Sequence, residues 1–164
     1  MRLRLLLLGL LATGLLALPG ISAAAASTPA ALRPPVIKEL FTLLPCTQKT
    51  TLGMEGCAEH QIVAGDRIID KAEIVLFSVL SHEAGPRALN RQAEMQLISA
   101  ATTWLAYRRA ECVSESAVNL GGSQAIVDSG QCEVALNTTR LAQLHAFYNA
   151  LLGEAPHVPP FPAS

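Results

Sequence analysis

Four cysteines are the residues of this chain whose types and spacing most directly predict chemistry: Cys46, Cys57, Cys112 and Cys132. An even number of cysteines in a small exported chain is typical of a disulfide framework. A zinc site would instead require Cys-x-x-Cys pairs or histidines at finger-type spacing, and the sequence has neither. We therefore expect two disulfides and no metal site. Three pairings are possible, and we favour the local pairs 46–57 and 112–132, which would each close a short loop.

Carboxylates beside an apolar helical stripe are the next candidates for chemistry. Four of them follow one another at steps of seven, four and three: Glu59, Asp66, Asp70 and Glu73. They could form a negative face that attracts a cationic partner, or a solvated face on which Arg67 and Lys71 offset the charge. Paired carboxylates can also hydrolyse sugars, but these share one helix and have no second wall to hold a substrate.

Serine and histidine chemistry is not supported by the spacing. Ser114 and Ser116 have no histidine and aspartate partners at helical distance, and His82-Glu83 lacks the second histidine of a zinc-protease helix. We therefore expect no catalytic residue, no cofactor and no enzymatic activity.

Helical periodicity predicts the elements that would position these residues. We expect long helices over about 56–81, 86–115 and 131–152, with a shorter helix around 36–44. The second helix should bury one row of side chains: Leu89, Ala93, Leu97, Ala100, Trp104 and Tyr107. The fold class is all-α, a small antiparallel bundle stapled by two disulfides, in which residues 113–131 would form a stapled arch.

The ends of the chain differ from this helical region in composition, so we divide the chain into four segments. Residues 1–26 have the charge, the apolar run and the Ala24-Ala25-Ala26 site of a signal peptide, and the apolar run is too short for a membrane anchor. Residues 27–36 would be a flexible lead-in, 37–153 the helical domain and 154–164 a Pro-rich disordered tail. Because no cysteine follows the cleavage site closely, we expect a periplasmic or secreted protein that is not a lipoprotein.

The charge of the mature chain limits its partners. Loss of two arginines with the leader leaves ten basic and thirteen acidic residues, a net charge near −3. Nucleic acid binding requires a basic patch, so we expect no nucleic acid partner, and no stable membrane insertion after cleavage.

A resemblance emerges from one stretch of residues. The segment Trp104-Leu105-Ala106-Tyr107-Arg108-Arg109-Ala110-Glu111-Cys112 is followed by Gly121-Gly122-Ser123, Cys132, Thr139 and Arg140. In this order the residues from 46 to about 144 resemble the N-terminal domain of the LprI-type lysozyme inhibitors, small exported bacterial proteins. The first helix matches less well, because Asp70 stands where the family has Asn and Glu73 where it has Tyr. Ala101 and Arg109 also depart from the pattern, and all four residues are compatible with a helix.

The resemblance implies an exported, non-enzymatic protein that binds and inhibits a lysozyme or a related wall hydrolase. The alternative is an envelope interaction module of the same fold that does not affect lysozyme. The implied partner is a protein, with a cationic lysozyme as the candidate. The residues expected to bind it are Gly121, Gly122, Ser123, Asp66, Asp70 and Glu73.

The motif residues have two kinds of expected role, in partner binding and in the structure of the bundle. The glycine loop would be a rigid, protruding element for an enzyme cleft, or a chain reversal that needs glycine for steric reasons. The other motif residues are expected to be structural: Trp104, Tyr107, Arg108, Glu111 and Arg140. Trp104 would anchor the core, with Arg108 bonded to carbonyls or to an acid at the end of the bundle.

Overall fold

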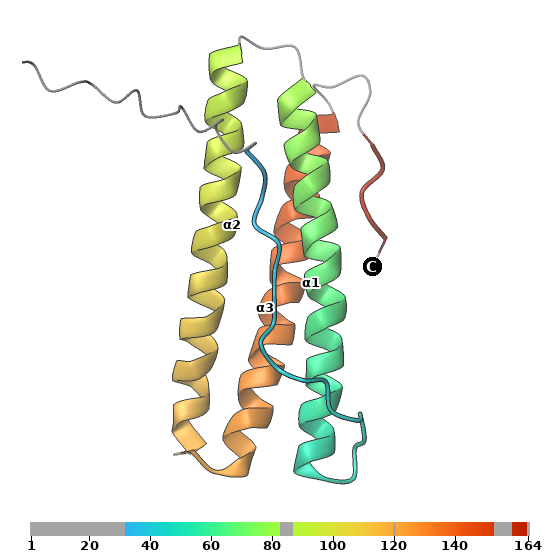
Figure 1. The fold of residues 1–164 in the computed structure, drawn as a ribbon, viewed down its shortest axis with the longest axis vertical. Coiled ribbons are helices and arrows are strands. Elements are labelled where there is room, and N and C mark those ends of the chain that lie inside the picture. Colours follow the sequence, from blue (N-terminus) through green and yellow to red (C-terminus); the bar gives the residue numbers. More distant parts are fainter. Residues whose placement is uncertain (1–31, 83–86, 120, 153–158, 164) are drawn as a thin grey trace, which may run out of the picture. The chain divides into compact units, whose positions relative to one another are not determined.

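Long helices make up most of the described chain. The computed structural model of the protein describes residues 32–82, 87–119, 121–152 and 159–163. Its elements are α1 (Thr51–His82), α2 (Arg87–Ser116), the 3-10 turn η1 (Ala117–Asn119) and α3 (Ser123–Leu152). α2 runs antiparallel to α1 and α3, which run in the same direction (Figure 1). The predicted all-α bundle is confirmed, and the predicted signal peptide lies outside the described residues.

The hydrophobic core lies where the three helices meet. Ile69, Ala72 and Leu76 of α1 pack against a cluster of residues from the other two helices: Leu97, Leu144 and Tyr148. The apolar stripe predicted for the first helix is therefore the buried face of α1. Burial of such side chains stabilises the fold by about 1.5–3 kcal/mol each.

The buried face of α2 differs from the predicted one. Leu89 and Tyr107 are exposed, although both were expected in the core. Its buried residues are Leu97, Ala101, Arg108 and Cys112. The buried row of α2 is therefore rotated relative to the predicted one and includes Arg108. An apolar pattern could not predict this, because it cannot identify a charged residue as part of the core.

Small residues let α1 and α3 approach closely. A Cβ atom at Gly65 would lie 2.9 Å from the Asn137 side-chain nitrogen, and one at Gly130 would lie 2.8 Å from the Cβ of Ala58. Both distances are too short for real Cβ contacts. The glycines therefore set the spacing at which the polar side chains between these helices can bond.

Residues 32–46, which we call the strap, are extended and carry no helix. The helix predicted around 36–44 is wrong, because α1 carboxylates bind the strap's backbone amides. Ile37 N–H donates to Asp70 Oδ1 (3.0 Å), and Leu44 N–H donates to Glu59 Oε2 (2.8 Å). The strap follows α1 along the side that faces α2 (Figure 1). Of the predicted flexible lead-in, residues 32–36 belong to this strap and Pro34 is buried.

Both predicted disulfides are present. Cys46 joins the end of the strap to Cys57 in the second turn of α1, and Cys112 of α2 joins Cys132 of α3. None of the helices in the described part of the chain combines the length and apolar character of a membrane span.

The C-terminal segment 159–163 contacts the bundle. The Tyr148 hydroxyl donates to the Pro159 carbonyl (2.7 Å), and the Phe161 ring lies 5.3 Å from the Tyr148 ring and 4.9 Å from His145. The prediction of a disordered tail therefore does not apply to these five residues.

Candidate functional site

The turn between α2 and α3 is short and has a defined conformation. The arch predicted over 113–131 is wrong, because α2 continues to Ser116 and α3 begins at Ser123. Gly121 has φ +78°, a backbone conformation that favours glycine. Gly122 N–H donates to the Asn119 carbonyl (2.9 Å), and Gly122 and Ser123 are exposed. The glycines thus make a tight, protruding reversal; Leu120 lies outside the described residues.

Asp128 clamps this turn from the first part of α3. Its carboxylate accepts hydrogen bonds from Asn119 Nδ2 and from Gln124 Nε2, the second at 2.9 Å. The Cys112–Cys132 disulfide ties the two helices together beside it. These contacts restrain Asn119 and residues 122–124 from both sides, which lowers the entropy that binding would cost.

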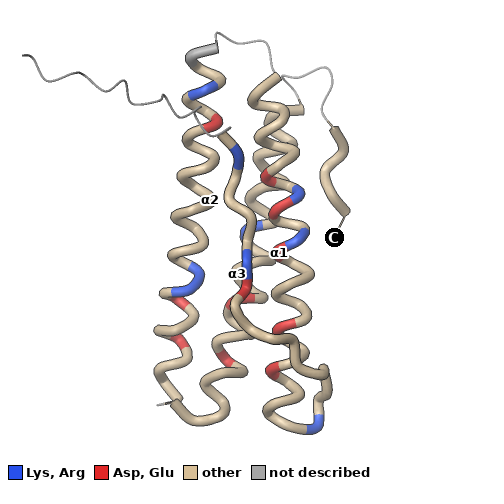
Figure 2. Tube along the Cα trace, in the orientation of Figure 1, with Lys and Arg blue, Asp and Glu red and all other residues tan. Residues whose placement is uncertain are grey.

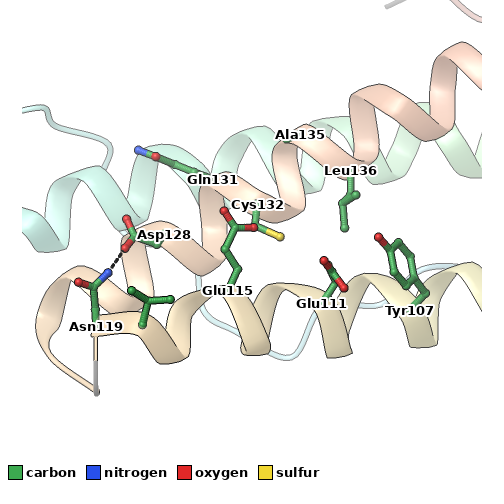
Figure 3. Close-up of a pocket in the computed structure, with 10 residues that line it drawn as sticks. Tyr107, Glu111, Glu115, Asn119, Asp128, Gln131, Cys132, Ala135 and Leu136 are labelled. Carbon is green, nitrogen blue, oxygen red and sulfur yellow. Dashed lines mark hydrogen bonds between the residues drawn. The ribbon is translucent and has the colours of Figure 1, made fainter.

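An acidic groove of about 510 Å³ lies next to the turn, between α2 and α3 (Figure 3). Its charged lining residues are Glu111, Glu115 and Asp128, and no lysine or arginine is among the described residues that line it. Tyr107 and the exposed Val118 give it apolar surface. Figure 2 shows acidic positions on the last turns of α2. Chemically, such a groove suits a basic side chain with an aliphatic stem.

The acidic residues of α1 lie elsewhere and are largely covered. Asp66 is 4 % exposed and Glu73 is 2 % exposed. Glu59 and Asp70 bind the strap backbone, and Asp70 is half-buried. The prediction of an exposed acidic face is therefore wrong for Asp66 and Glu73, because arginines of the other two helices bind them.

Arg108 is the centre of this buried polar network. Its Nη1 donates to Asp66 Oδ1 (2.6 Å) and to Asn137 Oδ1 (2.7 Å), and its Nη2 binds Glu39 of the strap. Its Nε lies 3.4 Å from Glu133 Oε2. One guanidinium thus joins all three helices and the strap.

A second buried pair lies one turn further along α3. Arg140 Nη2 donates to Glu73 Oε1 (2.7 Å). The Arg108 and Arg140 guanidinium carbons lie 5.2 Å and 5.6 Å from the centroid of the Trp104 ring. Trp104 therefore contacts both arginines through its π face, an arrangement that favours cations. Trp104, Arg108 and Arg140, which we expected to be structural, thus lie in contact through the Trp104 ring, whereas Tyr107 and Glu111 line the groove.

Three further residues belong to the network, and none of them was predicted from the sequence to be part of it: Glu39, Glu133 and Asn137. Asn137 Nδ2 donates to Asp66 Oδ1 (3.0 Å) and to the Ile62 carbonyl (3.3 Å). An asparagine three residues before Arg140, in register with buried Leu144, was the available signal. No such signal marks Glu39, because this residue lies in the strap, whose position was not predicted from the sequence.

Burial dominates the proton affinity of these carboxyl groups. It raises the pKa of Asp66 from 3.8 to about 6, although the Arg108 charge and hydrogen bond act in the opposite direction. Burial also raises the pKa of Glu73, against its bond with Arg140, and the pKa of Glu133. The folded protein therefore binds more protons than the unfolded chain in mildly acidic solution.

We expect the free energy of unfolding to fall as pH rises from 4.5 to 7.5. A carboxyl group whose pKa is raised on folding stabilises the fold below its unfolded pKa, and this contribution is lost as pH rises through the folded value, about 6 for Asp66. The expected loss is on the order of 1–3 kcal/mol, measured by urea denaturation at several pH values. Stability that increased over this interval would contradict the assignment.

The structure defines the class of protein: a disulfide-linked three-helix scaffold with a buried arginine centre and a clamped surface turn beside an acidic groove. The family described as lysozyme inhibitor LprI matches residues 46–144. The chain belongs to this family, which confirms the resemblance seen in the sequence. The comparisons with curated proteins and with solved structures found no match.

Proposed function

We propose that this protein is an exported inhibitor that binds a lysozyme or a related peptidoglycan hydrolase. Membership of the LprI family carries the proposal. The matched segment, residues 46–144, includes all four cysteines of the two disulfides. The binding surface would be the turn at residues 119–123 together with the acidic groove beside it. In this proposal the groove replaces the acidic face of α1, whose carboxylates are engaged inside the protein.

The clamped turn supports this role because an inhibitor that enters an enzyme cleft benefits from a rigid projecting element. No heavy atom outside the neighbouring residues lies within 4 Å of a Cβ placed on Gly121, so the tip is open to a partner. Val118, which is 81 % exposed, lies in the adjoining 3-10 turn and offers an apolar contact.

The acidic groove supports a cationic partner, and lysozymes are commonly basic. Complementary charge accelerates association and orients the encounter. A lysine or arginine of the partner could pair with Glu111 or Glu115, both of which are exposed.

Export is part of the proposal. Disulfides form and persist in oxidising compartments, and this fold contains two of them. Together with the signal peptide expected at residues 1–26, they favour a periplasmic or secreted protein. The proposal gives the protein a binding role and no catalytic one.

Ser123→Arg is expected to weaken inhibition at least tenfold, because a long charged side chain at the first residue of α3 would collide with an enzyme that contacts the turn. Purified oxidised protein would be titrated against C-type lysozyme, then against other lysozyme classes, with peptidoglycan turbidity as the readout. Ser99→Arg is the matched control, since Ser99 is exposed and lies about 25 Å along α2 from its end.

The outcomes separate the surface from the function. Equal inhibition by wild type and Ser123→Arg would refute the turn as the contact. If the wild type leaves every lysozyme fully active at micromolar excess, the inhibitor proposal fails. The protein would then be an envelope interaction module with another partner.

The double substitution Glu111→Gln and Glu115→Gln is expected to slow association with a basic lysozyme about five- to fiftyfold at low salt. It removes two negative charges from the groove without removing side-chain volume. Surface plasmon resonance at several salt concentrations would measure the rate and its salt dependence. Glu94→Gln, also on α2 but outside the groove lining, should leave the rate unchanged.

A further inference from the structure

The strap contributes a third carboxylate to a buried cluster that holds one cation. Glu39 of the strap, Asp66 of α1 and Glu133 of α3 all pair with Arg108 of α2. With every carboxyl group ionised, the cluster carries an excess of two negative charges. Arg108 is fully buried, so water screens this excess poorly.

Two oxygen atoms in the cluster mark where a proton would bind. Asp66 Oδ2 and Glu133 Oε2 are buried and have no hydrogen-bond partner. An ionised oxygen in such a position is costly, because it has lost its hydration and gained no donor. A proton on either oxygen removes one negative charge and turns an acceptor into a donor.

The strap is less tightly packed than the helices at this point. A cavity of about 280 Å³ lies between the strap and α1, with Glu39, Phe41 and Asp66 in its lining. A second cavity, of about 160 Å³, lies on the other side of Phe41 and reaches Glu133. Leu40, between Glu39 and Phe41, is 96 % exposed. Ile37 packs against the hydrophobic core, but the strap contributes none of the residues of the buried cluster itself, so opening of this part of the strap leaves that cluster in place.

We propose that the Glu39–Asp66–Glu133 cluster is a proton-linked latch for the strap. Uptake of one proton by the Asp66 and Glu133 carboxylates strengthens the pairing of Glu39 with Arg108 and holds residues 36–41 on the bundle. Loss of that proton, as the pH rises above about 6, weakens the pairing and lets this part of the strap open.

Thermodynamic linkage between proton binding and strap docking gives the direction of the pH effect. Burial is the main cause that raises the pKa of Asp66 and of Glu133, and the charge of Glu39 adds to it in both cases. Because docking of the strap favours proton binding, proton binding must favour docking to the same extent.

The other charged groups near the cluster do not reverse this direction. On α1, Arg67 lines the same cavity as Glu39, and burial raises the pKa of Asp70, although the hydrogen bond from the Ile37 amide acts in the opposite direction. On α2, the charge of Arg109 lowers the pKa of Glu133, but less than burial raises it. On α3, Asn137 is the neutral partner of Arg108 and Asp66.

Amide hydrogen exchange of the purified oxidised protein tests the latch residue by residue. The Ile37 amide binds Asp70 only while the strap is docked. After correction for intrinsic exchange, we expect its protection to fall about three- to tenfold between pH 5.5 and pH 7.5. The Leu44 amide, two residues from the Cys46–Cys57 disulfide, should keep its protection and serves as an internal control.

Two isosteric variants should reduce the pH dependence in different ways. Asp66→Asn mimics the protonated acid, so Ile37 protection at pH 7.5 should match that of the wild type at pH 5.5. Glu39→Gln removes the charge that adds to burial in raising the pKa of Asp66 and Glu133, so its Ile37 protection should change less with pH than that of the wild type. If Asp66→Asn does not fold, Glu133→Gln makes the same comparison at a less buried position.

Glu115→Gln, at an exposed carboxylate near the end of α2, should behave as the wild type in this experiment. Ile37 protection that stays constant or rises between pH 5.5 and 7.5 in the wild type would overturn the latch. Wild-type pH dependence that persists in both Asp66→Asn and Glu39→Gln would do the same.

Discussion

Arg108→Ala is expected to lower the free energy of unfolding by about 3–5 kcal/mol at pH 7.5. The guanidinium is fully buried and is the cation that Asp66, Glu39 and Glu133 share. Alanine would leave these carboxylates in a poorly hydrated region without a positive partner, and Asn137 would lose its donor. Urea denaturation followed by far-UV circular dichroism measures the loss.

Two neighbouring substitutions calibrate this result. Arg108→Lys keeps the charge but loses the planar set of donors, so a smaller loss of about 1–3 kcal/mol is expected. Arg109→Ala removes an exposed arginine from the same helix and should change stability by no more than about 0.5 kcal/mol. An Arg108→Ala variant as stable as Arg109→Ala would show that the buried network does not hold the bundle together.

The pH dependence of the same variant gives an independent check. Without Arg108, the carboxyl groups around Asp66 lose the charge that opposes the effect of burial on their pKa. They would therefore take up protons in mildly acidic solution and become neutral. The loss caused by Arg108→Ala should consequently be smaller at pH 5 than at pH 7.5.

Local patterns in the sequence predicted the three long helices and the disulfides, although α3 begins at Ser123 and not near residue 131. The apolar stripe of α1 repeats at helical spacing because one face of that helix, including Ile69 and Leu76, meets α2 and α3. The cysteine pairs are close in sequence, and in the bundle each links adjacent segments. These features depend on interactions between residues that are near one another along the chain.

The strap could not be predicted in the same way. Residues 36–44 have a composition compatible with a helix, but their amides bind carboxylates far along the sequence. Ile37 and Asp70 are thirty-three residues apart. A propensity argument has no access to such a partner, so the extended conformation appears only when α1 is in place.

The acidic residues of α1 illustrate the same limit at the candidate site. Asp66 and Glu73 flank the apolar stripe, and periodicity alone places such residues at its solvated border. Their true partners, Arg108 and Arg140, were visible in the family motif as structural residues, but nothing in the sequence paired them with α1. The glycines predicted a chain reversal or a protruding binding element, and the sequence left both open, whereas the acidic groove beside the turn depends on how α2 and α3 pack.

Replacing Cys112 and Cys132 together by alanine is expected to lower the free energy of unfolding by about 3 kcal/mol. The disulfide joins α2 to α3 over a separation of twenty residues, so its loss restores conformational freedom to the unfolded chain. It should also weaken lysozyme inhibition more than stability alone explains, because the same bond holds the two helix ends that the turn at residues 119–123 connects. Thermal unfolding measures the first effect, and the inhibition assay, run below the melting temperature of the variant, measures the second.

The Cys46–Cys57 pair provides the matched comparison for this second effect. This disulfide closes a shorter loop, with a sequence separation of eleven residues. Its removal is therefore expected to cause a slightly smaller loss of stability, about 2.8 kcal/mol. Because that bond fastens the strap to the start of α1, its loss should leave inhibition at low temperature nearly unchanged if the turn between α2 and α3 is the contact. Equal loss of inhibition in the two variants would place the contact elsewhere, whereas loss confined to the Cys112 and Cys132 variant would tie inhibition to the geometry of that turn.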